Sequence, residues 1–230
     1  LLAATLVSCG GDSGAFDNGV DMTGHYAGTV TLGGVPYSES RMLVDGEGHF
    51  VLNSWPYLLV GDIRTSDNTF TAKADAFSFE PGFANGSNST VSGSKSGTLV
   101  SGTFTGGSLS GSVSLGNSTA GSIPTSIDAF TGSHSGFMNL GHANYYDAGT
   151  ITVLSDGTFT ADYGGGCIVE GQLSVRVVDG NLYGFTATLE GCGANGTVRG
   201  GLGYQSFDGE LILYGRLGNV PVRIYLNSAG

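Results

Sequence analysis

The fold is decided by a short pattern that occurs twice in the chain. It reads Thr23-Gly24-His25-Tyr26-Ala27-Gly28 in the first half and Thr131-Gly132-Ser133-His134-Ser135-Gly136 in the second. Each copy opens an apolar run that ends in Leu-Gly, at Leu32-Gly33 and at Leu140-Gly141. Alternation of apolar and polar residues is typical of β-strands that bury one face. The sequence therefore predicts two related β domains in tandem.

An Asp-Gly pair follows each of these runs and precedes a phenylalanine. Asp45-Gly46 comes before Phe50, and Asp156-Gly157 comes before Phe159. Asp-Gly between alternating runs is a strong hairpin signal, because both central residues of such a turn must adopt positive φ. We therefore expect tight hairpins here, with Asp and Gly at the centre of each turn.

Short alternating runs recur along the whole chain, and no window carries a sustained helical period with caps. The clearest runs are 26–32, 49–52, 98–104, 109–115, 149–153, 182–189, 210–216 and 220–226. We predict an all-β protein of two tandem antiparallel β-barrel or sandwich domains, with about eight strands each. Closure into a barrel would remove the edges that such Ser- and Gly-rich strands otherwise expose.

Composition places the boundary between the two domains near residue 125. The segment 116–126 is rich in Gly and Ser, contains Pro124 and has few apolar residues, as linkers do. The predicted organisation is a signal-peptide remnant, a flexible tether, an N-terminal β domain, a linker and a C-terminal β domain, at residues 1–8, 9–21, 22–120, 121–128 and 129–230.

The charge balance excludes one class of partner. The chain has 230 residues, with 8 Lys and Arg against 19 Asp and Glu, and its net charge is −11. An acidic chain without a basic patch repels phosphate backbones, so we expect no binding of nucleic acid.

The first residues are almost wholly apolar up to Val7, and they are too few to span a bilayer. The four residues Leu6-Val7-Ser8-Cys9 resemble the bacterial lipobox. This resemblance implies that Cys9 becomes the lipidated N-terminus, with a thioether-linked diacylglycerol and a further acyl chain such as palmitate. Gly10 rather than Asp after the cysteine favours the outer membrane. The alternative is the end of a signal peptide with an incidental cysteine.

Two further cysteines lie in the second half of the chain. Cys167 and Cys192 each follow glycine and adjoin an alternating run. Export to an oxidising compartment favours a disulfide between them, which would stabilise the domain by about 3 kcal/mol, and two buried free thiols are the alternative. Neither cysteine forms a Cys-x-x-Cys motif, so redox catalysis and zinc binding have no support.

Together, the lipobox, the Thr-Gly strand openings and the Gly-Cys pairs resemble a group of two-domain proteobacterial envelope lipoproteins. The resemblance covers most of residues 9 to 227, and its motifs are structural, so it implies no particular function. In architecture the chain is also similar to surface lipoproteins of the transferrin-binding and factor H-binding types, whose β-barrel lobes bind host proteins.

Patterns for catalysis are weak. Ser92-Gly93-Ser94-Lys95 fits a Ser-x-x-Lys pattern, but that chemistry needs a helix and this stretch has strand or loop composition. The four histidines are dispersed, without metal-ligand spacing, at His25, His49, His134 and His142. We therefore predict no catalytic residue, no metal and no cofactor. A glycan hydrolase with a carboxylate pair is a less favoured alternative.

Aromatic residues are the remaining candidates for a binding site. Trp55 and Tyr57 flank a proline, and Tyr145 and Tyr146 are adjacent in the second half. Exposed at a barrel mouth, they would stack on a sugar or anchor a protein partner, while the alternative is that they fill the barrel cores. The expected function is a membrane-anchored, non-catalytic binding module for a protein, a glycan or a small apolar ligand. A periplasm-facing assembly factor that contacts peptidoglycan or an outer-membrane complex is the alternative.

Overall fold

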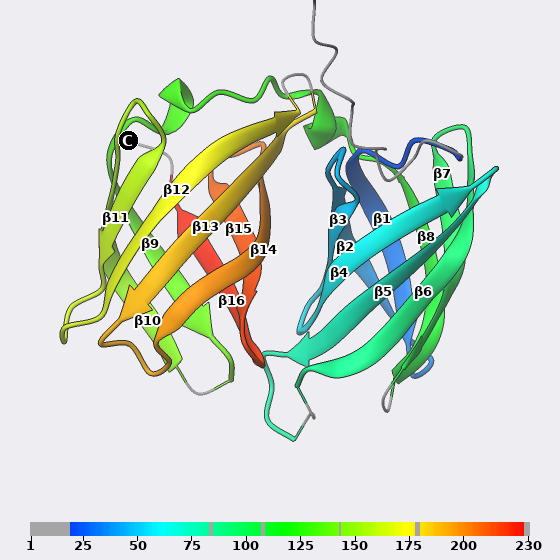
Figure 1. The fold of residues 1–230 in the computed structure, drawn as a ribbon, viewed down its shortest axis with the longest axis horizontal. Helices are drawn as coiled ribbons and strands as arrows, with labels where there is room; N and C mark the ends of the chain where they lie inside the picture. Colours follow the sequence, from blue (N-terminus) through cyan, green and yellow to red (C-terminus); the bar gives the residue numbers. More distant parts are fainter. Residues whose placement is uncertain (1–18, 83–84, 107–108, 143, 178–179, 228–230) are drawn as a thin grey trace, which may run out of the picture.

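The computed structural model describes residues 19–82, 85–106, 109–142, 144–177 and 180–227. They form two closed antiparallel barrels that stand side by side (Figure 1). The all-β prediction with two eight-stranded domains is confirmed, and both domains are barrels rather than sandwiches. No helix among these residues has the length and apolar character needed to cross a membrane.

The strands of each barrel follow one another in sequence order, and the last pairs with the first. Barrel 1 consists of β1 (Gly24–Leu32), β2 (Val35–Val44), β3 (His49–Ser54), β4 (Tyr57–Ser66), β5 (Thr69–Ser78), β6 (Ser87–Ser96), β7 (Leu99–Gly106) and β8 (Leu109–Asn117). Barrel 2 consists of β9 (Gly132–Leu140), β10 (Asn144–Val153), β11 (Thr158–Asp162), β12 (Ile168–Val177), β13 (Leu182–Glu190), β14 (Gly196–Gln205), β15 (Leu211–Leu217) and β16 (Val220–Leu226).

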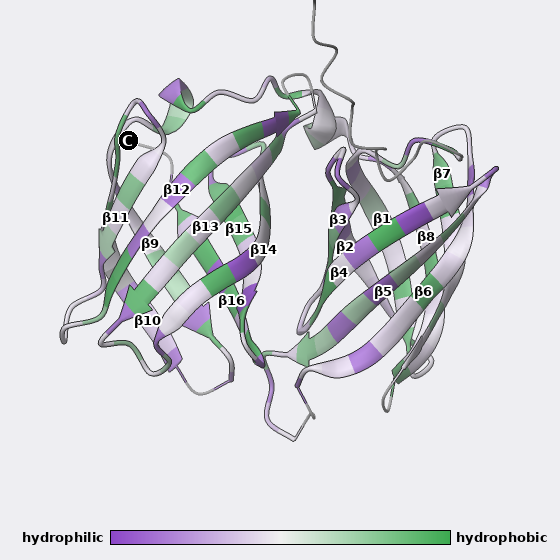
Figure 2. Ribbon diagram, viewed as in Figure 1, coloured by the Kyte–Doolittle hydropathy of each residue, from purple (hydrophilic) through white to green (hydrophobic). Residues whose placement is uncertain are grey.

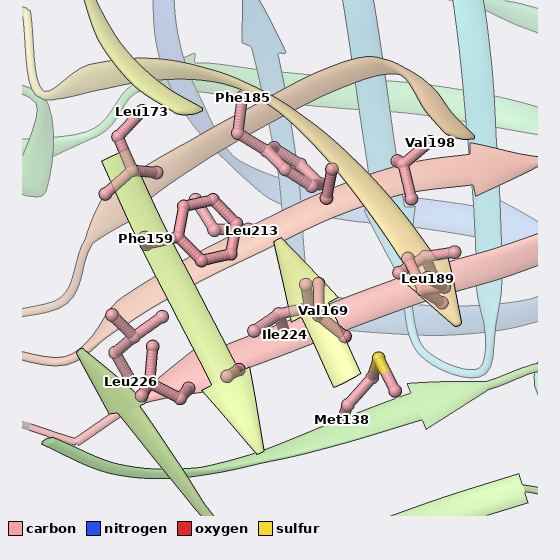
Figure 3. Close-up of a cluster of buried hydrophobic side chains, with 14 of the residues drawn as sticks. Met138, Phe159, Val169, Leu173, Phe185, Leu189, Val198, Leu213, Ile224 and Leu226 are labelled. Atoms are coloured by element: carbon pink, nitrogen blue, oxygen red, sulfur yellow. The ribbon is translucent and has the colours of Figure 1, made fainter. Parts of the chain in front are cut away.

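Apolar and polar residues alternate along the visible strands (Figure 2), and the apolar ones fill the interior of each barrel. Barrel 1 encloses Met42, Phe50, Leu59 and Phe104, among others. Figure 3 shows the same packing in barrel 2, where Phe159, Phe185 and Ile224 come from separate strands. Both barrels therefore have a solid core rather than a lumen.

The repeated pattern closes one end of each barrel in the same way. The hydroxyl of Tyr26 donates to the carbonyl of Met22, 2.9 Å away, and Nε2 of His134 lies 2.7 Å from the carbonyl of Phe130. Both contacts reach back four residues, and Met22 and Phe130 are buried in their barrels. Tyr26 and His134 are thus structural equivalents, and His134 has a structural role.

The Asp-Gly hairpins form, but the turn geometry differs from the prediction. Asp45, Gly46 and Asp156 do not have positive φ, whereas Gly48 and Gly157 both have a φ of 85°. Gly48 donates to the carbonyl of Asp45, and Gly157 to that of Leu154. Each loop therefore has four residues, and the left-handed glycine is the last of them. In the first loop the Asp45 side chain stabilises this geometry, because it accepts from the backbone amides of Glu47 and His49.

A third apolar cluster joins the outer faces of the two barrels. It takes Leu43, Val51, Leu58, Val60, Phe77 and Phe79 from barrel 1 and Leu182, Leu202, Tyr204, Ile212 and Tyr214 from barrel 2. The strands that supply these residues are buried on both faces, which explains the continuous apolar runs 58–60 and 211–214. We call this contact the inter-barrel interface.

Two arginines form ion pairs that flank the interface. Arg176 of β12 lies 3.3 Å from Glu47 and 3.9 Å from Asp45, and Arg216 of β15 lies 3.3 Å from Asp75. In each pair the arginine comes from barrel 2 and the carboxylate from barrel 1, so the pairs fix the orientation of one barrel against the other.

The connection between the barrels, residues 118–131, contacts both of them, and Ser118 donates to the carbonyl of His25 in barrel 1. It contains two 3-10 turns, Thr119–Ser122 and Asp128–Phe130, and includes the predicted linker. Asn181, which is fully buried, donates to the carbonyl of Ala120, and Thr125 donates to that of Val177. The predicted linker is therefore held against barrel 2 at Thr125.

The predicted tether, residues 9–21, is described only at its end. Gly19 forms a parallel bridge with Asp67 in the β4–β5 turn, and Val20 donates to the same residue. Where the chain is described, the tether prediction is thus too long, because residues 19–21 already lie against barrel 1.

A candidate binding groove between the barrels

The structure separates the four predicted aromatic residues into two kinds. Trp55, in the β3–β4 turn, is 45% exposed, and Tyr145, in β10, is 57% exposed. Tyr57 and Tyr146 instead pack against the cores of barrels 1 and 2. The Tyr146 hydroxyl also accepts from the amide of Gly193, 2.6 Å away, beside Cys192. Two of the four side chains are therefore exposed, and the other two are partly buried against the cores.

Trp55 and Tyr145 are the two ends of one row of side chains, which we call the aromatic track. The Tyr145 ring lies 5.6 Å from that of Phe137, and Phe137 stacks on Tyr225 at 4.1 Å. The guanidinium carbon of Arg223 lies 4.7 Å from the Tyr225 ring centre and 4.0 Å from that of Trp55. The track thus runs from β10 across β9 and β16 to barrel 1.

Between the barrels, the barrel 1 end of the track opens into a groove of about 600 Å³. One wall is formed by β2 and the end of β3, and the other by β14, β15 and β16. The lining residues are Pro36, Tyr37, Ser38, Glu39, Ser40, Arg41, Asn53, Trp55, Tyr204, Tyr214, Arg223 and Tyr225. This volume and mixture of aromatic and polar groups are typical of small-ligand sites, which measure about 300–1,000 Å³.

Polar groups in the groove lack partners. Asn53 is 7% exposed and its side-chain oxygen accepts no hydrogen bond. The Nε of Arg223 is also buried without an acceptor. Among the residues that the structure describes, neither Arg41 nor Arg223 makes an ion pair, and Glu39 is the one carboxylate lining the groove. The groove therefore offers unsatisfied donors and an unsatisfied acceptor.

Tyrosine hydroxyls lie beside these groups. Burial, followed by the neighbouring hydroxyls of Tyr204 and Tyr225, raises the pKa of Tyr214 well above its usual value. Burial also raises the pKa of Tyr225, while the charge of Arg223 acts in the opposite direction. These tyrosines stay neutral at physiological pH and can both donate and accept hydrogen bonds.

His25 lies next to this site. Its ring is 4.5 Å from that of Tyr204 across the interface, and neither ring nitrogen has a hydrogen-bond partner. Burial and, second, the charge of Arg41 lower the pKa of His25 from 6.5 to about 3. His25 is therefore a neutral interface residue, and it lies apart from His134 on a different barrel face.

Sequence reasoning missed Phe137, Arg223 and Tyr225. In β16, Val222, Ile224 and Leu226 point into barrel 2, so Arg223 and Tyr225 must point outward. An arginine and an aromatic residue on the exposed face of a strand were a usable signal. No sequence signal marks the contact between Trp55 and Arg223, because 168 positions separate the two residues in the chain.

One cluster has the residue types of a metal site. Asp45, Glu47 and His49 each have a ligand atom within 4.8 Å of the others. These carboxylates already interact with Arg176, and Asp45 accepts from two backbone amides. The cluster is therefore part of the inter-barrel contact, and we assign it no metal.

The weak catalytic patterns do not assemble into a site among the described residues. Ser92 and Lys95 both lie in β6, and Nζ of Lys95 donates to the carbonyl of Asp21 and the hydroxyl of Tyr26. A glycosidase of the usual kind needs two facing carboxylates, and the groove has only Glu39. His49 and His142 lie outside the groove.

The remaining cysteine predictions concern lipidation and the disulfide. Cys167 and Cys192 form a disulfide, with sulfur atoms 2.11 Å apart, between the start of β12 and the residue after Gly191. Cys9 and the lipobox lie outside the described residues.

Comparison with known proteins adds no relative: no protein-family model matches the chain, and no curated protein does.

Proposed function

We propose that the protein is a membrane-anchored envelope lipoprotein that acts as a non-catalytic binding module and takes its ligand in the groove between its two barrels. The observation that carries the proposal is the set of unpartnered polar groups, Asn53 and Arg223, beside exposed aromatic surface at Trp55. Buried polar groups are normally satisfied, and exceptions often mark functional positions. Both barrel interiors are filled, so a ligand has to bind on the outer surface, where the groove presents these groups.

The strand order supports the anchored arrangement. The described chain begins at Gly19 and leads into β1 at one rim of barrel 1. Trp55 lies in the β3–β4 turn at the opposite rim, and Tyr145 lies near the start of β10, at the end of barrel 2 away from the start of β9. An acyl anchor on Cys9 would hold the first rim near the membrane and leave Trp55 and Tyr145 facing away from it.

Photo-crosslinking from the groove tests the binding function. A photoreactive residue in place of Ser38, which is exposed and lines the groove, should give an adduct on intact cells. The same residue in place of the exposed Leu154, which does not line it, is the matched control. The Ser38 adduct should be lost in a Trp55→Ala background. Equal labelling from both positions, unaffected by Trp55→Ala, would contradict a groove-based function.

The intact, non-reduced mass of the protein from its native membrane tests the anchor. We expect the chain from Cys9 plus acyl chains, minus two hydrogens for the disulfide. A Cys9→Ser variant should lose the acyl mass and leave the membrane fraction. An unlipidated mass for the unsubstituted protein would show that the lipobox interpretation is wrong.

A further inference from the structure

The groove carries positive charge in an acidic protein. The net charge is −11, yet Arg41 and Arg223 line the groove without an ion pair to any described residue. The two other interface arginines, Arg176 and Arg216, are each neutralised by carboxylates of barrel 1. Uncompensated guanidinium groups are suited to carboxylate and phosphate, to which they donate paired hydrogen bonds.

The groove also has an acceptor that requires a donor. The oxygen of Asn53 is buried without a partner, and such a group costs about 1–3 kcal/mol while it stays unsatisfied. A ligand that places a hydroxyl there recovers this cost. A simple carboxylate or an inorganic anion supplies no such donor, whereas the hydroxyl groups of a sugar do.

Aromatic surface is the third feature. Trp55 is 45% exposed, and Tyr37 and Tyr225 line the same groove. Aromatic rings of this kind combine an apolar face with a polar tip, which matches a ring that is apolar on its faces and polar at its edge. A pyranose ring has this character, and the volume of about 600 Å³ holds more than one such ring.

From these three features together we infer that the groove binds an acidic saccharide, a sugar that carries a carboxylate. The carboxylate is received by Arg223 and Arg41, a ring hydroxyl donates to Asn53, and the sugar ring lies against Trp55. This inference rests on the proposed binding function and specifies its ligand class. Loss of Arg223 should weaken acidic ligands much more than neutral ones, whereas loss of the Asn53 acceptor should weaken acidic and neutral sugars alike.

The inference is tested with trigalacturonic acid, a hyaluronan tetrasaccharide and 3′-sialyllactose, each compared with its carboxyl methyl ester. Trp55 is the single tryptophan of the chain, so its fluorescence reports occupation of the groove directly. At least one acid should bind ten times more tightly than its ester or better. Arg223→Met should remove that difference, and Asn53→Leu should weaken acid and ester by similar factors.

Arg199→Met is the matched control, because Arg199 is exposed on β14 and does not line the groove. It should bind the acid as the unsubstituted protein does. If Arg223→Met fails to fold, Arg41→Met, which changes the arginine from barrel 1, is used instead for the comparison of acid and ester. Esters that bind as tightly as acids would overturn the acidic ligand while the binding function stands. If none of the three acids binds, the inference is wrong, and the crosslinking experiment decides the function separately.

Discussion

At the scale of the residue, two histidines lie one position apart in the repeat and have different surroundings. His134 occupies the place of Tyr26 and points toward the core of barrel 2, while His25 comes one residue earlier in the repeat and points outward. Successive strand residues face opposite sides, so a shift of one residue exchanges core for surface. The repeat aligns His134 with Tyr26 and His25 with Ser133, but nothing in the sequence marks which of two bulky neighbours faces inward.

His25 makes the stability of the protein depend on pH. Its folded-state pKa of about 3 lies below the unfolded value of 6.5, so the unfolded chain binds the proton more readily. The stabilisation is complete above pH 6.5 and is lost as the pH falls toward 3, by about 1.4 kcal/mol per pH unit.

Chemical denaturation across this pH range measures the effect. His25→Phe keeps a ring against Tyr204 and should lose less stability than the unsubstituted protein as the pH falls from 6.5 to 4. His142→Phe, at an exposed position, is the control and should follow the unsubstituted protein. Parallel curves for all three proteins would show that His25 does not carry this dependence.

At the scale of the element, sequence pattern located the strands better than their ends. The run 26–32 lies within β1 and the run 220–226 coincides with β16, because both alternate clearly. In β6 (Ser87–Ser96) the one large apolar residue is Val91, so no alternation marks where that strand starts or stops. Its ends are set by pairing with β5 and β7, which a local pattern does not contain.

The β2–β3 turn gives a direct test of the corrected hairpin geometry. Gly48 has a φ of 85°, and an L side chain in this conformation costs about 1–2 kcal/mol. Gly46→Ala is the matched control, because Gly46 lies in the same turn without positive φ and has open space around its Cβ position. Denaturant midpoints should fall for Gly48→Ala and change little for Gly46→Ala. The reverse order would restore the turn expected from Asp45-Gly46.

The disulfide constrains the β11–β12 loop against the end of β13. Replacing Cys167 and Cys192 together with serine should lower the free energy of unfolding by about 3 kcal/mol, the value for a closed loop of this length. Reduction of the unsubstituted protein should produce the same loss, and reductant should have no effect on the double variant. If the double variant loses stability but reductant does not destabilise the unsubstituted protein, the serines, not the missing bond, destabilise the domain.

At the scale of the whole molecule, the two barrels behave as one body because their outer faces share a buried cluster. Sequence analysis gave two domains and a linker but no interface, since it treats each half separately. Residues 58–60 indicated the interface, because three consecutive apolar residues in a strand place apolar side chains on both of its faces. The groove was equally hidden, because its two walls come from different barrels.

We therefore expect the protein to unfold in a single calorimetric transition. Leu58→Asp places a charge in the interface and should split this into two transitions, one for each barrel. Leu59→Ala, at the neighbouring position inside barrel 1, should destabilise by about 2–5 kcal/mol without splitting the transition. Two transitions in the unsubstituted protein would show that the interface does not couple the barrels.

Each barrel also begins and ends at the same rim. The start of β1 lies beside the end of β8, where Tyr26 pairs with Asn117, and the start of β9 lies beside the end of β16, where Gly136 pairs with Leu226. An even number of antiparallel strands makes this unavoidable. Each barrel is thus a closed unit whose two ends lie at the same rim. A third barrel could be inserted into the chain at that rim, or one barrel removed, without threading a strand through an existing sheet.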